Sequence, residues 1–414
     1  MFPITGDKFL LKFLGKTLLE HQIEQALAAG LNDIVIVGNQ QNIERLNEIV
    51  RKFPSVHIKL AIQREPSGIA DALITAQKLI ENEMIVVNPS DIFEESAYAM
   101  ILEERKRGSA SSYILGTRVK NHFPGAYLVV DEKKDIHHIV DQPRRGEEPS
   151  DVVSIVVHLH SDAKALYKYL KKGETLTDDA YKQALEGMLN GGHKLKLVEY
   201  GDFWGSIKHP WHIFAAMEYF LDCSEASIAP SASISESATI EGGVIIDENV
   251  KVLENAVIRG PCYIGKHTII GNSVLIRDHS HIGAECVVGF GTEIKHSYIG
   301  DGCWFHRNYI GDSIIADRCS LGAGTITANL RFDEGKVAIE SDDETLDTGL
   351  IKLGAIIGAH SKTGINASIM PGVRIGPNSL VGPHVLLTHD LEPDKSIQLN
   401  THNTIIERKM GTDC

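Results

Sequence analysis

In the C-terminal half, the residue best suited to chemistry is His306, in the sequence His306-Arg-Asn-Tyr-Ile-Gly-Asp-Ser. A second polar stretch, Gly322-Ala-Gly-Thr-Ile-Thr-Ala-Asn329, follows soon after it. A neutral imidazole that titrates near neutral pH can accept a proton from an attacking nucleophile. The simpler interpretation of His306 is a surface or core histidine, one of 19 in the chain.

A six-residue repeat must position these segments. Every sixth residue from Ile228 to Ile294 is isoleucine or valine, at twelve positions without a miss. This period is typical of a coil with three flat faces, in which one aliphatic side chain per face points to the axis and stacks on its neighbours. The sequence therefore predicts a left-handed parallel β-helix from about Ile228 to about Asp390.

Two features interrupt the repeat. The register breaks near Gly300–Asn308, which predicts an excursion from the coil at that point. The polar and acidic segment Arg331–Thr348 predicts an exposed loop, after which the repeat returns at Ile357. Because an isolated coil leaves flat faces and open strand edges, we expect a homo-oligomer, specifically a homotrimer.

From Thr17 to Leu221 the pattern alternates between helices and strands. Apolar residues at helical spacing begin at Thr17 and stop near Gly30, and Asp33–Gly38 is a short apolar run of the kind found in buried parallel strands. This alternation predicts βαβ units and a doubly wound α/β sheet. We place the domain limits at residues 1–222 and 228–400. The next expected elements are a helix at 42–53, a strand at 56–63, a helix at 69–80 and a strand at 84–88.

Composition limits the class of protein. The formal net charge of −14 argues against general nucleic-acid binding, because phosphates would be repelled over most of the surface. The six cysteines form no C-x-x-C pair, which favours reduced thiols in the cytoplasm. No apolar run reaches the length of a membrane span, and no signal peptide precedes the first helix. We therefore expect a cytoplasmic protein with small-molecule substrates.

The order of an α/β half and a hexapeptide β-helix resembles the bifunctional enzymes of UDP-N-acetylglucosamine synthesis. These join a sugar-1-phosphate nucleotidyltransferase domain to a glucosamine-1-phosphate acetyltransferase domain. Their acetyltransferase domains carry H-x-x-Y-x-G-D and then G-A-G-T-I-T-x-N, and every fixed position is present between His306 and Asn329. The resemblance implies transfer of the acetyl group of acetyl-CoA to the amine of an amino-sugar phosphate such as glucosamine-1-phosphate. His306 is then the base for the attacking amine.

The resemblance also implies which residues bind the two substrates. Two departures bear on the identity of the amino sugar: Ser320 stands where the family usually has Asn, and the spacing between Lys295 and His306 is shorter than usual. The implied residues are Tyr309, Asn329 and Lys336 in the sugar-phosphate pocket, Arg277 and Lys295 on its phosphate side, and Ala323 and Gly382 where acetyl-CoA lies against the coil.

The N-terminal half matches the family less completely. The family's nucleotidyltransferases begin with a strand and a loop of the form L-A-A-G-x-G-x-R, which hold the nucleoside triphosphate. This sequence begins with Met1-Phe-Pro-Ile-Thr, which looks like the residues just after that loop, so we expect the first strand and the phosphate loop to be missing. The matching positions are Lys8, with Asp7 in place of the proline of P-K-x-L, Gln63 for reading the base, and Gly68, with Ile69 in place of threonine.

The expected metal site is also incomplete. Asp91 matches the first metal-binding aspartate, but Ser206 replaces its partner, and Mg²⁺ prefers carboxylate oxygens. We therefore expect a scaffold domain that has lost nucleotidyl transfer, with Mg²⁺ needed only if the domain is active. Lys8, Gln63, Gly68 and Asp91 are then relics of a nucleotide site. Further departures are Asp141-Gln-Pro in place of E-K-P, and Ser154 and Val156 in place of N-x-G.

The residues leave three alternatives to the acetyltransferase open. The chain is a sugar-1-phosphate nucleotidyltransferase, making a UDP- or dTDP-sugar, if the true N-terminus lies upstream. It is a non-catalytic regulatory homologue if it resembles the regulatory chain of GDP-mannose pyrophosphorylase. A metal site of His279, His281 and His306, as in β-helical carbonic anhydrases, lacks a matching carboxylate motif. The intact His306 motif favours the acetyltransferase.

Overall fold

The computed structural model of the protein describes residues 1–170, 179–340 and 345–400. It divides into two compact units. We call the first the coil unit, made of Met1–Gly6, Lys12–Gly15 and the chain from Ile207 onwards. The second, the front unit, is made of Asp7–Leu11 and Lys16–Ser206. These units do not coincide with the predicted limits of 1–222 and 228–400, because the first residues and the last helix before the repeats pack on the coil.

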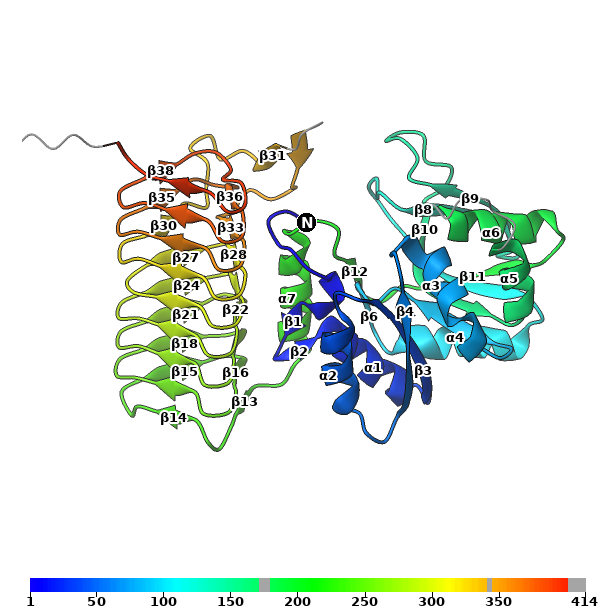
Figure 1. Ribbon diagram of the computed structural model, residues 1–414, viewed down its shortest axis with the longest axis horizontal. Helices are drawn as coiled ribbons and strands as arrows, with labels where there is room; N and C mark the ends of the chain where they lie inside the picture. Colours follow the sequence, from blue (N-terminus) through cyan, green and yellow to red (C-terminus); the bar gives the residue numbers. More distant parts are fainter. Residues whose placement is uncertain (171–178, 341–344, 401–414) are drawn as a thin grey trace, which may run out of the picture. The chain divides into compact units, whose positions relative to one another are not determined.

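The coil unit is a left-handed parallel β-helix with three sheets, as predicted (Figure 1). We call the sheets faces A, B and C in the order in which the chain visits them. Face A holds β13 (Ser227–Ile228), β16 (Val244–Ile246), β19 (Cys262–Ile264), β22 (Ser280–Ile282), β25 (Tyr298–Ile299), β28 (Ile314–Ile315), β33 (Ile356–Ile357) and β36 (Arg374–Ile375).

Face B holds β14 (Ser233–Ile234), β17 (Lys251–Val252), β20 (Ile269–Ile270), β23 (Val287–Val288), β26 (Trp304–Phe305), β29 (Ser320–Leu321), β34 (Lys362–Thr363), β37 (Leu380–Val381) and β39 (Ser396–Ile397). Face C holds β15 (Thr239–Glu241), β18 (Val257–Arg259), β21 (Leu275–Arg277), β24 (Glu293–Lys295), β27 (Tyr309–Gly311), β30 (Ile326–Thr327), β35 (Ser368–Ile369) and β38 (Leu386–Leu387).

The aliphatic ladder forms the core of the coil. The predicted positions from Ile246 to Ile294 are buried in one cluster, while Ile228 in the first coil is about half exposed. Burying such a side chain contributes about 1.5–3 kcal/mol. The ladder therefore holds the corners of the coil, which carry the polar residues, in a fixed register.

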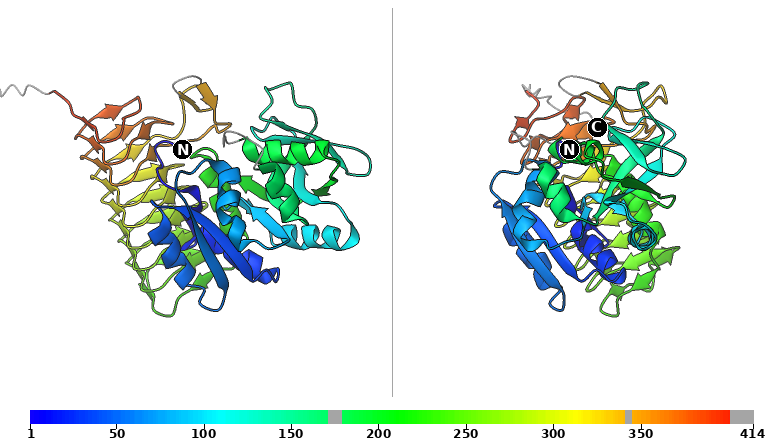
Figure 2. Two further views of the ribbon diagram at one scale, coloured as in Figure 1. Left: turned by 45° about the vertical axis from the view of Figure 1, so that its right-hand side comes forward. Right: turned by 90° about the vertical axis from the view of Figure 1, so that its right-hand side faces the viewer.

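The predicted excursion near Gly300–Asn308 is wrong. Ile282 pairs with Ile299 and Ile299 with Ile315, so the coil continues there with shorter turns. The real excursion lies between Ile315 and its next partner Ile357. It contains the predicted loop and a two-stranded hairpin, β31 (Ala338–Glu340) and β32 (Thr345–Asp347), which projects from the stack (Figure 2). Residues 341–344 lie outside the described residues.

Helix α7 (His212–Asp222) and the strand β1 (Lys12–Phe13) belong to the coil unit. The Phe13 ring stacks on Phe220 of α7 at 5.1 Å between centroids and tilts onto Tyr298 of face A at 5.6 Å. Tyr298 in turn stacks on His281, which also stacks on Tyr263. This aromatic contact fixes α7 against the coil.

The front unit confirms the predicted alternation of helices and strands. Thr17 and Glu20 form a capping box at the start of its first helix. The elements are η1 (Lys8–Leu10), β2 (Lys16–Thr17), α1 (Leu18–Ala28), β3 (Asp33–Asn39), α2 (Ile43–Arg51), β4 (His57–Gln63), α3 (Gly68–Ala76), η2 (Gln77–Leu79), β5 (Met84–Val87), β6 (Asp91–Phe93), α4 (Ser96–Arg107), β7 (Ser112–Arg118), β8 (Ala126–Val130), β9 (Ile136–Asp141), β10 (Val152–His160), α5 (Ala163–Leu170), α6 (Ala180–Asn190), β11 (Leu195–Glu199) and β12 (Trp204–Ser206).

The sheet of the front unit is divided. In the described part of the chain, β3 pairs with β4 alone, and β5 joins the larger sheet through β10. A cavity of about 830 Å³ is lined by the consecutive residues 33–37 of β3 and 84–87 of β5. Because successive strand residues point to opposite faces, such a run places the cavity along the open edges of both strands. The cavity therefore lies in the layer of the sheet.

Candidate active site

Three of the predicted sugar-phosphate residues, Arg277, Lys295 and Asn329, meet at one corner of the coil, where the chain passes from face C to face A. Arg277 and Lys295 end successive face-C strands and lie side by side in register, with Gly311 beyond Lys295. Asn329 follows the next strand, β30. Four successive coils thus bring two cations and an amide into one column, which we call the C–A corner.

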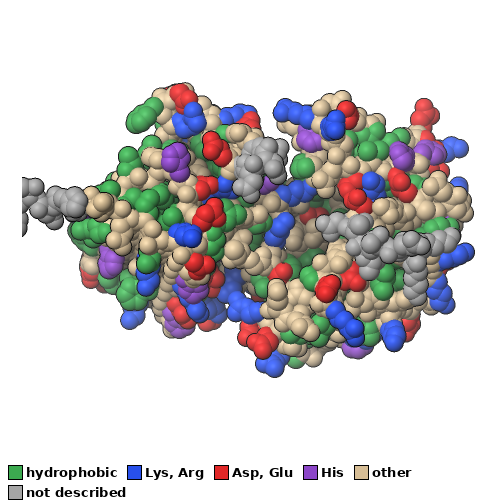
Figure 3. All heavy atoms as spheres, turned by 45° about the horizontal axis from the view of Figure 1, so that its top comes forward, with side chains coloured by type: hydrophobic (Ala, Val, Ile, Leu, Met, Phe, Trp, Pro, Cys, Tyr) green, Lys and Arg blue, Asp and Glu red, His purple; other side chains and the backbone are tan. Residues whose placement is uncertain are grey.

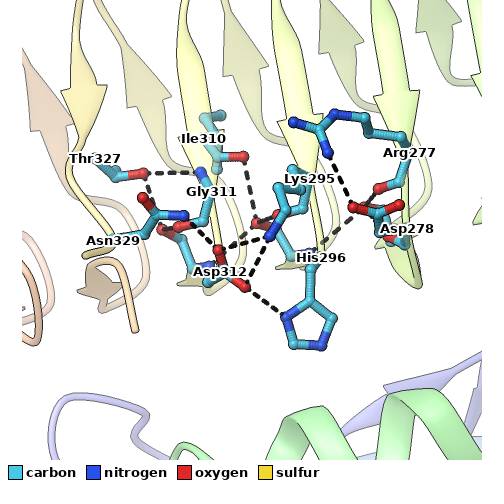
Figure 4. Close-up of polar contacts among 12 residues, drawn as sticks. Arg277, Asp278, Lys295, His296, Ile310, Gly311, Asp312, Thr327 and Asn329 are labelled. Carbon is cyan, nitrogen blue, oxygen red and sulfur yellow. Dashed lines mark hydrogen bonds and ion pairs between the residues drawn. The ribbon is translucent and has the colours of Figure 1, made fainter. Parts of the chain in front are cut away.

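Asp312 joins Lys295 and Asn329 within this column (Figure 4). Its carboxylate oxygens lie 3.1 and 3.3 Å from the Lys295 ammonium and accept a hydrogen bond of 2.9 Å from His296 Nδ1. The Asn329 amide also donates to it. The side chain of Asp312 is 4% exposed and that of Lys295 is 15% exposed, so this pair is largely shielded from solvent.

The protonation states at the C–A corner follow from these contacts. Burial alone would raise the pKa of Asp312, but the hydrogen bonds from His296, Asn329 and Lys295 lower it overall. Burial would lower the pKa of His296, but its hydrogen bonds with Asp312 and Glu218 of α7 raise it to about 9. Asp312 is therefore a carboxylate and His296 an imidazolium at neutral pH.

Arg277 is held by two carboxylates of its own. Its guanidinium donates to Glu293 at 2.8 and 3.0 Å and to Asp278 at 3.0 Å. A guanidinium fork suits phosphate oxygens as well as carboxylates. A phosphate at this corner would compete with Glu293 for Arg277.

His306 lies at a different corner, where the chain passes from face B to face C. Its backbone N–H donates to the Asn308 side chain at 2.9 Å, and the Asn308 amide donates to Gly322 O at 2.8 Å. Asn308 is buried, while the side chain of His306 is exposed. The backbone is thus pinned and the imidazole is open to a substrate.

The predicted acetyl-CoA positions share this B–C corner with His306. Gly324 N–H donates to Arg307 O, which stacks the Ala323 turn on the His306 turn, and Asn366 N–H donates to Ala323 O. Gly382 follows β37 at the same corner further along the coil. Ala323 is exposed and Gly382 is half-buried. Because Ala323 and Gly382 have little or no side chain, few atoms project from the B–C corner beyond His306.

Tyr309 connects the two corners across face C. It begins its strand three residues after His306, and its hydroxyl lies 3.5 Å from the Asn329 amide. A side chain at Gly311 would meet that hydroxyl at 2.7 Å, so glycine leaves room for the phenol. The strand between the corners spans about 10 Å. Face C is therefore a floor with His306 at one edge and the cations at the other.

Two predicted groupings are not found at these corners: Lys336 with the other sugar-phosphate residues, and a metal site of three histidines. Lys336 lies in the excursion, where its exposed ammonium is 3.3 Å from Asp347. His281 is buried in the aromatic stack and His279 bonds to Asp222, so neither meets His306. Within residues 1–170, 179–340 and 345–400, no three histidine, cysteine or carboxylate side chains are placed to hold a metal.

Sequence reasoning missed His296 and Glu218 and gave Asp312 no role. Asp312 is a fixed position of the quoted motif, and His296 follows Lys295 directly, so both carried a signal. Glu218 carried none, because it meets His296 only through the docking of α7, 78 residues away in the chain.

The nucleotide-site positions in the front unit lie on expected elements. Ser206 of β12 is directly opposite Asp91 of β6, so the serine occupies the place predicted for a second carboxylate. Asn88 donates to Asp91 at 3.3 Å. This donor set offers Mg²⁺ one carboxylate, an amide and a hydroxyl, a poorer fit than two carboxylates.

The other three predicted positions are held locally. The Gln63 amide donates to Asp71 at 2.7 Å. Gly68 begins α3 with a φ of +82°, a conformation that favours glycine. Lys8 begins the short helix η1 and is partly buried.

Comparisons with known proteins cover both units. Residues 1–217 match the nucleotidyl transferase family, and residues 354–389 match the bacterial transferase hexapeptide family of six repeats. The bifunctional protein GlmU of Methanococcus maripaludis is 31% identical over 418 residues, covering 99% of this chain and 97% of that protein. In the described part of the chain, no helix is long and apolar enough to cross a membrane.

Two further relatives match most or part of the chain. A bifunctional sugar-1-phosphate nucleotidylyltransferase/acetyltransferase of Sulfurisphaera tokodaii is 29% identical over 395 residues, covering 94% of this chain and 93% of that protein. An uncharacterized acetyltransferase of Escherichia coli, YaiX, is 38% identical over 165 residues, covering 40% of this chain and 70% of that protein.

Proposed function

Because the chain belongs to the family of bifunctional sugar-1-phosphate nucleotidyltransferases and acetyltransferases, we propose that its coil unit transfers the acetyl group of acetyl-CoA to the amine of an amino-sugar phosphate such as glucosamine-1-phosphate. One observation carries the proposal. The exposed imidazole of His306 lies at one edge of face C, the cations Arg277 and Lys295 lie at the other edge, and Tyr309 lies on the face between them. The relatives named for acetyl transfer support the reaction class.

The chain's own residues would perform the transfer in a simple order. Arg277 and Lys295 bind the phosphate, while Tyr309 and Asn329 orient the sugar over face C. The amine nitrogen attacks the thioester carbon, His306 accepts the proton that the nitrogen loses, and the C–S bond breaks. His306 then returns that proton to the leaving sulfur, so that coenzyme A departs as its thiol and the imidazole is neutral again. Lys336 would reach the sugar phosphate from the excursion, and Ala323 and Gly382 would give the coenzyme room at the B–C corner.

A homotrimer would complete this site. Large apolar side chains are exposed on faces B and C and at the corner between them. In the view of Figure 3, apolar and charged side chains are mixed on the visible surface of the coil. Apolar surface of this kind is typical of a contact between protein chains. The exposed residues are Phe290, Trp304, Ile326, Ile365, Leu380 and Leu386.

The test of the proposed function is release of free thiol from acetyl-CoA across a panel of amino sugars. Glucosamine-1-phosphate should be acetylated fastest, and glucosamine without phosphate much more slowly, because the C–A corner then has no anion to bind. Mass spectrometry of the product should show an added acetyl group on nitrogen. No turnover of any sugar in the panel, together with tight binding of a related catalytic subunit, would support the regulatory alternative instead.

For the front unit, two proposals remain to be separated. We propose that it serves as a scaffold without nucleotidyl transfer, which is supported by Ser206 opposite Asp91. The alternative is a sugar-1-phosphate nucleotidyltransferase completed by upstream polypeptide, which is supported by the family match over residues 1–217 and by the cavity between β3 and β5. In an active domain Asp91 would hold Mg²⁺, which neutralises charge on the phosphates.

Pyrophosphate release from UTP or dTTP with a sugar-1-phosphate separates these proposals. The scaffold proposal predicts no release above the rate without protein, with Mg²⁺ present. Release at a steady rate would establish the nucleotidyltransferase. The same assay on protein carrying any in-frame upstream codons tests whether an added strand supplies the activity.

A further inference from the structure

Helix α7 reaches the C–A corner through two histidine–carboxylate pairs. His279 Nε2 lies 2.8 Å from Asp222, and His296 Nε2 lies 2.8 Å from Glu218. Glu218 and Asp222 are four residues apart and so share one face of the helix. The two pairs are alike in chemistry and join the same helix to successive coils.

His296 differs from His279 in what its second nitrogen contacts. His296 Nδ1 bonds to Asp312, the carboxylate that also holds Lys295 and Asn329 (Figure 4). Since both ring nitrogens face carboxylate oxygens, both carry protons. The ring is also stacked on Phe214 of α7 at 4.8 Å between centroids. Helix α7 thus fixes the position of the His296 ring, and the ring in turn holds Asp312 at the C–A corner.

The charge of His296 matters to a phosphate at this corner. Asp312 is a buried anion beside the ammonium of Lys295, and alone it would cancel the positive charge of Lys295. With His296 protonated, the carboxylate of Asp312 is shared between two cations, while the carboxylate of Glu218 binds the other ring nitrogen of His296. Asp312 therefore neutralises the charge of Lys295 less completely, which leaves Lys295 better able to attract phosphate. A neutral residue in place of His296 would leave Lys295 as the cation beside Asp312.

We propose that His296 is a positioning residue of the acceptor site, linking Glu218 of α7 to Asp312 so that Lys295 and Asn329 keep their orientation and Lys295 keeps an available charge. The inference rests on the proposed acetyl transfer and deepens it. It makes α7 a structural part of the sugar-phosphate site, although the helix supplies no group to the reacting atoms.

The test compares His296→Ala and Glu218→Gln with a matched control, His279→Ala, which breaks the second histidine–carboxylate pair between the coil and α7. Loss of the charge-assisted hydrogen bond to Asp312 predicts that KM for glucosamine-1-phosphate rises about tenfold in His296→Ala. We expect a smaller rise in Glu218→Gln, with kcat and KM for acetyl-CoA changed less than about twofold in both. His279→Ala should keep the wild-type KM.

Two controls make the outcomes decisive. Circular dichroism and gel filtration should show that each variant is folded, and calorimetric binding of glucosamine-1-phosphate should follow the same order as KM. An unchanged KM in folded His296→Ala, or an equal rise in His279→Ala, would overturn the inference while leaving acetyl transfer in place. Wild-type protein that neither binds nor acetylates the sugar overturns the proposed function first, and this inference with it.

Discussion

At the residue scale, the candidate base is fixed through its backbone and left free at its side chain. Asn308 accepts a hydrogen bond from His306 N–H and donates to carbonyls of the next coil. The imidazole itself remains exposed. A base that must meet an incoming amine needs this freedom, whereas a binding cation such as Lys295 gains from being held.

The pKa of His296 gives a prediction for stability. Its pKa in the folded protein, about 9, is above the ordinary value of 6.5. The stabilisation from its ion pairs is therefore complete below about pH 6.5 and is lost as the pH rises to about 9. Urea unfolding of wild type should show this loss between pH 6.5 and 9.5, and His296→Gln should show a flatter dependence.

Other groups that face His296 do not explain such a loss. Asp312, whose pKa is lowered, remains a carboxylate over this range, Phe214 is uncharged, and Glu218 and Lys295 are present in both proteins. An NMR titration of the His296 ring gives the direct check. A midpoint at or below 6.5 would show that the two carboxylates do not hold the proton.

The sequence predicted part of this chemistry and could not predict the rest. His306, Tyr309 and Asn329 were named because they match fixed positions of the family's motifs, and the same resemblance implied Arg277 and Lys295. The period of the coil explains why Arg277 and Lys295 end neighbouring strands. Glu218 was beyond reach, because its contact with His296 depends on how an aromatic cluster seats α7 on the coil. No local pattern in the sequence encodes that docking.

At the scale of elements, the six-residue period identified the coil but misjudged its corners. Where a turn is shorter, the spacing between successive inward side chains along the sequence falls below the regular repeat, but the side chains still stack. Ile294, for example, pairs with Ile310. Buried side chains set the register, so a shorter corner costs less than a broken ladder. In the front unit, by contrast, short strands between helices gave nearly the observed bounds for β3, β4 and β5.

Close approach of successive corners gives a prediction for Gly322. A side chain there would lie 2.8 Å from Gly364 O, a backbone atom that cannot move aside easily. Gly322→Ala should destabilise the coil by about 1–3 kcal/mol in denaturant unfolding. Gly243→Ala is the control, because its nearest neighbour would be 4.0 Å away. Equal stability of the two variants would contradict the close packing of this corner.

At the scale of the whole molecule, the exposed apolar side chains on faces B and C predict self-association. Sedimentation should give the mass of three chains for wild type. The double variant Trp304→Glu/Leu380→Glu should shift the protein toward monomer, because charge on two half-exposed apolar positions opposes a dry contact. Ile228→Glu, in the first coil, should remain a trimer. A monomeric wild type would remove the trimer from the proposal.

The most direct test of the central claim is the rate of thiol release from acetyl-CoA with glucosamine-1-phosphate in His306→Ala. Loss of a general base predicts a fall of about 100-fold or more in kcat, with the KM for both substrates little changed. His360→Ala, which removes an exposed histidine from another corner of the coil, should keep the wild-type rate. Wild-type turnover that persists in folded His306→Ala would contradict the account.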